Sequence, residues 1–144
     1  MQKLIVVLTA VALAALVPLA PSGAAAQDPV KIGVPMTLSG IAAQVGVDNK
    51  NGIVLAAKHK KTLLGRPIQL LIEDVEGKPE VAVRKAEKMV FKDGAVAILG
   101  VAFSNVGLAI AKETERLGVP FLTTNVMTPQ IYGIHKHVFR AGQL

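Results

Sequence analysis

The stretch AILGVAFSNVGLAIAKETERLGVPFLTTNVMTP, residues 97–129, decides the fold of this chain. It opens with an apolar run that stops at Gly100, continues as a helical pattern over Ser104–Leu117, and ends in a second apolar run. A strand, a helix and another strand in this order are typical of a right-handed crossover in a parallel sheet. Ser104 and Asn105 lie where the strand gives way to the helix, so they either cap the helix or bind a ligand.

The same alternation extends to both sides of this stretch. Strands are predicted at residues 30–35, 68–74, 95–100 and 119–125, with a fifth candidate at 137–142, and helices at 44–61, 79–93 and 104–117. The strands are continuous apolar runs, which is typical of strands covered by helices on both faces. The fold class is therefore α/β, a doubly wound parallel sheet. Gly52 weakens the first helix, and we expect it to allow close packing against the sheet.

The first 26 residues have the pattern of a cleaved secretory signal peptide. Lys3 is followed by an apolar run and then by small residues, with a cleavage position before Gln27. A transmembrane anchor, the alternative, would need about 20 uninterrupted apolar residues, but Pro18 interrupts this run. The chain has no cysteine, so lipid attachment to an N-terminal cysteine and disulfides are excluded. Residues 27–144 then form one small domain, and we expect a periplasmic location.

Several function classes lack their sequence signatures. The chain carries a net charge of +6 but only 3% aromatic residues, which disfavours nucleic-acid binding. No glycine-rich nucleotide motif follows a strand, and Ser104 has neither a nucleophile-elbow motif nor a marked base. His135 and His137 could ligate a metal, but no third metal ligand is marked. Glu73 and Asp74 at a strand end resemble a phosphoacceptor site, which an export signal argues against. No cofactor is therefore expected.

Three loops at the predicted carboxyl edge of the sheet share an uncharged, polar composition. They cover residues 37–46, 100–105 and 123–128 and combine Gly, Ser, Thr and Asn with few charges. Ligands of open parallel sheets bind at this edge, where the strand order reverses. Free N–H groups at the start of the 104–117 helix favour an anion such as a carboxylate. Plain capping of helices and turns is the alternative, and three coincident loops favour a small polar ligand.

The segments around these loops resemble the N-terminal lobe of the leucine/isoleucine/valine-binding (type I) family of periplasmic substrate-binding proteins of ABC transporters. The matching segments are VKIGVPMTLSGIAAQVG, NGIVLAA, IQLLIEDVEGKPEVAVRKAEKMV, ILGVAFSNVGLAIA and LGVPFLTTNVMTP, which together span nearly all of residues 27–144. The resemblance implies a two-lobed, monomeric receptor without enzymatic activity. It would close around an amino acid or related small carboxylate and deliver it to an ABC transporter permease.

The resemblance also implies roles for individual residues. Ser104 matches the serine that receives the ligand carboxylate, and Ala102 and Phe103 match residues that contribute backbone groups beside it. Asn125 matches a residue whose backbone carbonyl accepts a hydrogen bond from the ligand ammonium. These residues are the predicted polar part of the site.

Two positions depart from the family pattern. Met127 stands where the family supplies a threonine hydroxyl, which removes a hydrogen bond and adds a polarizable apolar surface. Val45 stands where an aromatic wall is common. A side group other than that of a branched-chain amino acid, or a less polar carboxylate, is compatible with these changes.

The family has a second lobe, so residues 27–144 would form only part of the first lobe. We therefore expect weak or no ligand binding by this chain alone, because one side of the ligand would remain in water. Two alternatives remain: a ligand-sensing receptor domain of the same fold, and a small secreted α/β enzyme.

Overall fold

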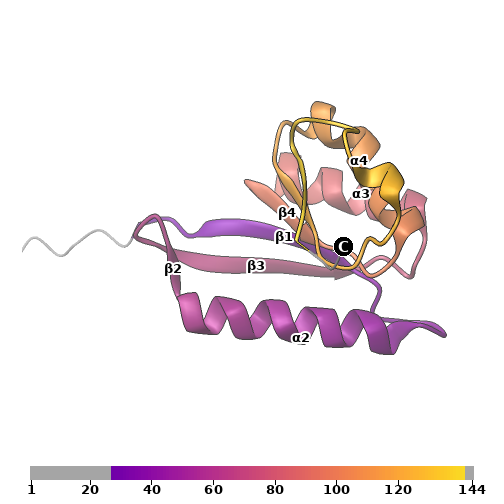
Figure 1. Ribbon diagram of the computed structural model, residues 1–144. Coiled ribbons are helices and arrows are strands. Elements are labelled where there is room, and N and C mark those ends of the chain that lie inside the picture. Colours follow the sequence, from indigo (N-terminus) through magenta and orange to yellow (C-terminus); the bar gives the residue numbers. More distant parts are fainter. Residues whose placement is uncertain (1–26, 142–144) are drawn as a thin grey trace, which may run out of the picture.

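The computed structural model describes residues 27–141, which form one six-stranded sheet with helices on both faces (Figure 1). The strand order is β2-β3-β1-β4-β5-β6. The elements are β1 (Val30–Met36), α2 (Ala43–Lys60), β2 (Thr62–Leu63), β3 (Arg66–Asp74), α3 (Pro79–Glu87), η2 (Lys88–Lys92), β4 (Ala97–Gly100), α4 (Ser104–Leu117), β5 (Phe121–Thr123), η3 (Pro129–Ile131) and β6 (Val138–Arg140). The predicted α/β fold is confirmed. The predicted signal peptide, residues 1–26, lies outside the described residues.

The strand order reverses at β1: β2 and β3 lie on one side of this strand, and β4, β5 and β6 lie on the other. This strand pairs in parallel with β3 on one side and with β4 on the other, so that Ile32 is opposite both Leu70 and Ala97. The first crossover, through α2, therefore runs to one side, and the second, through α3, passes over β1 to the other. Helix α2 lies on one face of the sheet, whereas α3 and α4 lie on the other (Figure 1). The carboxyl ends of β1 and β4 thus form the switch point at which such sheets bind ligands.

Two apolar clusters hold the helices to the sheet. The larger cluster joins α3 and α4 to the sheet through side chains such as Met89, Ile98 and Phe121. The smaller cluster lies under α2 and contains Val34 and Met36 of β1. Phe103 is partly buried and packs against both clusters, which fixes the start of α4 to the edge of the sheet.

Several sequence predictions need correction. Strand β3 was expected to be buried, yet none of its residues is, because only the two-residue antiparallel strand β2 lies beyond it. The helix predicted for residues 79–93 changes into a π-helical turn at Lys88, where the Asp93 N–H bonds to the Lys88 carbonyl. Gly52 does not pack against the sheet: it is exposed, and no atom lies within 4 Å of the position a Cβ would take.

The ends of α2 and α4 lie within one residue of the predicted helix ends. Gly118 ends α4 in the left-handed conformation, with φ of 68°. The basic run Lys58, His59 and Lys60 occupies the last turn of α2, where exposed carbonyls favour cations. Within residues 27–141, no helix has both the length and the apolar character needed to cross a membrane.

Candidate ligand-binding site

The loops that follow β4 and β5 lie next to each other at the carboxyl edge of the sheet. The two strands are parallel neighbours, with Leu99 opposite Leu122 and Gly100 opposite Thr123. Each loop therefore begins at the same level, beside the switch point between β1 and β4.

Two hydrogen bonds connect four of the six predicted site residues. The side-chain amide of Asn125 donates to the carbonyl oxygen of Ala102 at 3.1 Å. The backbone N–H of Met127 donates to the hydroxyl oxygen of Ser104 at 3.2 Å. Both bonds join residues 23 positions apart in the sequence, so they fix the two loops against each other.

Ser104 and Asn105 do not cap α4. The N-cap residue is Phe103, and no side chain in the described part of the chain bonds to the free N–H groups at this helix end. Ser104 is the first helical residue, and its hydroxyl oxygen is directed to the neighbouring loop instead. The first N–H groups of an α-helix have no partner within the helix, and together with the helix dipole they favour an anion. This end of α4 can therefore receive a carboxylate, with the Ser104 hydroxyl as an additional donor.

The turn before α4 has an unusual backbone conformation. Gly100 and Val101 have positive φ angles of 126° and 69°. A left-handed conformation is strained for a β-branched residue, and Val101 is completely buried. Thr124 holds this turn: its N–H donates to the Gly100 carbonyl at 3.2 Å, and its hydroxyl donates to the Val101 carbonyl at 3.3 Å. Sequence reasoning assigned no role to Thr124, since nothing in the sequence marks a left-handed valine.

Asp74 holds the loop that follows β1. Its Oδ1 atom accepts hydrogen bonds from the N–H groups of Leu38 and Glu76, each at 2.8 Å. Burial alone would raise the pKa of Asp74, but hydrogen bonds from the Ser39 hydroxyl and these two N–H groups bring the pKa below its ordinary value of 3.8. Asp74 is therefore an anionic anchor for a site loop. Its position at a strand end was noted in the sequence, but this role was not predicted.

Two of the predicted residues, Met127 and Val45, supply apolar surface, whereas Phe103 packs against both apolar clusters. Met127 is 68% exposed beside Ser104, to which its backbone is bonded. Val45 lies on the first turn of α2 and is 39% exposed. It takes no part in the two hydrogen bonds that join the loops after β4 and β5. An apolar ligand group would therefore meet Met127 on this side of the site.

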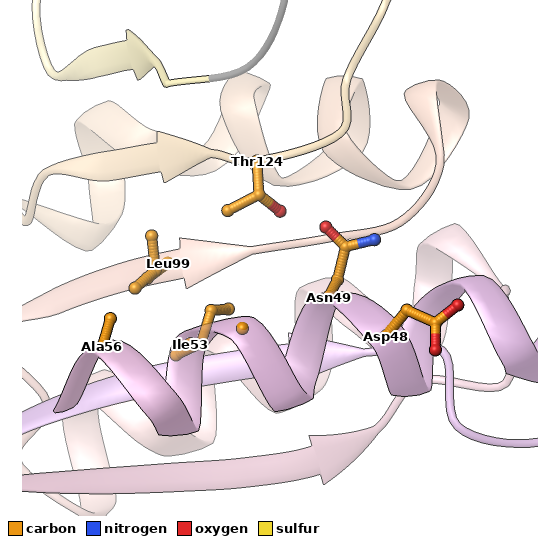
Figure 2. A pocket seen from close by; sticks show the side chains of 7 residues that line it. Asp48, Asn49, Ile53, Ala56, Leu99 and Thr124 are labelled. Atoms are coloured by element: carbon orange, nitrogen blue, oxygen red, sulfur yellow. The ribbon is translucent and has the colours of Figure 1, made fainter. Parts of the chain in front are cut away.

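A groove of about 490 Å³ lies between α2 and the sheet (Figure 2). Its lining residues come from α2, β4 and the loop after β5: Asp48, Asn49, Gly52, Ile53, Ala56, Leu99 and Thr124. None of the six predicted ligand residues lines it. Thr124 is the link between this groove and the ligand loops, because it also holds the turn before α4.

The two histidines considered as metal ligands line a separate cavity of about 350 Å³ near the end of α4. His135 Nδ1 lies 3.7 Å from a carboxylate oxygen of Glu115. Within the part of the chain that the structure describes, no three His, Asp or Glu side chains are grouped as a metal site.

Comparison with known families identifies the family to which this chain belongs. A sequence profile described as "Periplasmic binding protein" matches residues 29–144, most of the chain. This chain belongs to the periplasmic binding protein family. Members of this family are solute-binding proteins, and the family implies an extracytoplasmic location. Among curated proteins, none matches the sequence.

Solved structures of ABC transporter substrate-binding proteins share the fold. A leucine binding protein from Thermotoga maritima is 31% identical, with a TM-score of 0.73, and the match covers 77% of this chain and 32% of that one. An amino acid ABC transporter substrate-binding protein from Pseudomonas fluorescens is 33% identical, with a TM-score of 0.73 and coverages of 80% and 31%. A solute binding protein from R. palustris, solved with 4-hydroxybenzoate, is 26% identical, with a TM-score of 0.72 and coverages of 78% and 31%. The chain spans about a third of the length of these proteins.

Proposed function

We propose that this chain forms the first part of an extracytoplasmic solute-binding protein that delivers an amino acid or a related small carboxylate to an ABC importer. The observation that carries this proposal is the joining of the Ser104 and Asn125 loops at the open N-terminal end of α4. Residues 1–26 would direct export as a cleaved signal peptide, and residues 27–144 would form part of the N-terminal lobe.

The ligand carboxylate would bind at the first turn of α4. The Ser104 hydroxyl would donate a hydrogen bond to this carboxylate, because its oxygen already accepts a hydrogen bond from the Met127 N–H. Backbone groups of Ala102 and Phe103 would border the carboxylate, and the Asn125 carbonyl would accept from a ligand ammonium. Met127, together with Val45, would contact the apolar part of the ligand.

The chemistry shared by the ligands of similar proteins supports a carboxylate. One neighbour is named as a leucine binding protein, and another was solved with 4-hydroxybenzoate. An α-amino acid and an aromatic acid have little in common except the carboxylate. The uncharged loops and helix N-terminus of this chain suit that group, whereas the apolar group is left to Met127 and to surfaces beyond residues 27–141.

The affinity of this chain alone should be low. Its site is one wall, so the ligand keeps one side in water, where hydrogen bonds contribute little net free energy. We expect dissociation constants of about 1 mM or higher. A value of 1 mM corresponds to a binding free energy of about −4 kcal/mol.

Ligand-observed NMR with leucine and 4-hydroxybenzoate tests the proposal, with leucinamide and 4-hydroxybenzamide as neutral analogues. Saturable binding of the two acids, lost in the amides and weakened several-fold by Ser104→Ala, is the expected result. Asn105→Ala, an exposed side chain on the same helical turn, should bind as the parent does. Equal binding of acids and amides, or acid binding that Ser104→Ala leaves unchanged, would overturn the proposed site.

A further inference from the structure

The carbonyl oxygens of three consecutive residues before α4 accept hydrogen bonds from the neighbouring loop. Those of Gly100 and Val101 accept from the N–H and the hydroxyl of Thr124, and that of Ala102 accepts from the Asn125 side chain. An unpaired carbonyl oxygen beside a bound carboxylate would repel it. The three donors therefore pair with the carbonyl oxygens of this turn, so that a bound carboxylate would meet the N–H groups of α4 instead.

The backbone of this turn cannot relax into an ordinary extended conformation while these bonds persist. Val101 is left-handed at φ of 69° and completely buried, and Gly100 precedes it with φ of 126°. Glycine adopts such angles readily, whereas a β-branched residue keeps them only where its surroundings impose them. The strained residue Val101 is held directly by a side chain, because its carbonyl accepts a hydrogen bond from the Thr124 hydroxyl.

We propose that Thr124 is a positioning residue of the ligand site. Its hydroxyl holds Val101 in the left-handed conformation that keeps the carbonyls of the turn away from the ligand and aims the start of α4 at the carboxylate. This inference rests on the proposed function and adds to it a residue that does not touch the ligand. Thr124 also lines the groove (Figure 2), and its hydroxyl donates to the Val101 carbonyl of the turn.

Three substitutions separate this role from a general contribution to folding. Thr124→Val keeps the shape of the side chain and removes the hydroxyl, whereas Thr124→Ser keeps the hydroxyl. Thr62→Val, on an exposed strand residue, is the matched control. In the leucine and 4-hydroxybenzoate titrations we expect Thr124→Val to weaken binding by about tenfold, Thr124→Ser to remain within about twofold, and Thr62→Val to be unchanged.

A second readout needs no ligand. Amide resonances of residues 102–105 in the ¹⁵N spectrum should shift in Thr124→Val and return to their parent positions in Thr124→Ser, because the hydroxyl is the group of the Thr124 side chain that bonds to the turn. Thr124→Ala replaces the valine variant if thermal unfolding shows that the latter does not fold.

The two proposals fail in different ways. Suppose that the parent chain binds the acids, that Ser104→Ala weakens this binding, and that Thr124→Val binds as the parent does. The positioning role is then overturned and the proposed function stands. Unchanged amide resonances of residues 102–105 in Thr124→Val overturn the positioning role whatever the ligand data show. If the parent chain binds acids and amides equally, or if Ser104→Ala leaves acid binding unchanged, the proposed function falls first.

Discussion

The side-chain amide of Asn125 donates a hydrogen bond to the backbone carbonyl of Ala102 at 3.1 Å, and so ties the loop after β5 to the loop after β4. Asn125→Ala removes this bond and leaves a partly buried carbonyl unpaired. We expect the free energy of unfolding to fall by about 1 kcal/mol, measured by urea denaturation. Asn51→Ala, an exposed position within α2, should change it by less than about 0.5 kcal/mol. Equal effects of the two substitutions would show that the loops are not held by this bond.

Two glycines in α2 should respond to alanine in opposite directions. At Gly46 a Cβ would lie 1.6 Å from the carbonyl oxygen of Thr37, so the start of α2 would have to move away from β1. Gly46→Ala should therefore destabilise the protein by about 2 kcal/mol or more. At Gly52 no atom lies within 4 Å of the added carbon, and Gly52→Ala should stabilise by about 0.5–1 kcal/mol because alanine favours a helix. Urea midpoints that shift in the same direction would contradict this difference in packing.

Thr123 is completely buried at the end of β5, and its hydroxyl has no hydrogen-bond partner among residues 27–141. Thr123→Val removes this unpaired group at nearly constant shape, and we expect a gain of about 1 kcal/mol in the free energy of unfolding. Thr114 is the matched control, since it is equally buried but donates to the Ile110 carbonyl at 3.2 Å. Thr114→Val should bring no gain. A loss of stability in Thr123→Val would reveal a partner for its hydroxyl.

The anchor at Asp74 predicts a pH dependence. Folding lowers the pKa of this carboxyl, so its contribution to stability is complete above the unfolded value near 3.9 and is lost as pH falls through the lower folded value. The parent chain should therefore lose stability between about pH 5 and pH 2 more steeply than Asp74→Asn. Urea unfolding at several pH values measures this difference. Parallel pH profiles for the two proteins would mean that Asp74 gains nothing from its charge in the folded state.

The sequence was sufficient to predict the alternation of strands and helices, the limits of α4 and the edge at which the site loops meet. These features follow from local signals: apolar runs for β4 and β5, Gly118 as a helix stop, and the rule that parallel strands end at one edge. The convergence of Ser104 with Asn125 needed only the order β4-β5 in the sheet.

Other features depend on contacts that have no local signal. Val101 is left-handed, and its carbonyl accepts a hydrogen bond from Thr124, 23 residues later. The π-helical turn at Lys88 and the open position of Gly52 depend on how the helices meet the sheet. Glycine in a helix fits either tight packing or an open groove, and only the tertiary structure distinguishes Gly46 from Gly52.

The central claim is that the joined loops after β4 and β5 form the wall that receives a small carboxylate. A ¹⁵N-resolved titration of the chain with 4-hydroxybenzoate maps this wall directly. We predict saturable shifts at the amides of residues 102–106 and 125–127, with the largest at Ser104 and Asn105. Saturable shifts confined to the groove residues of α2 or to the His135 cavity, with residues 102–106 unmoved, would contradict the account.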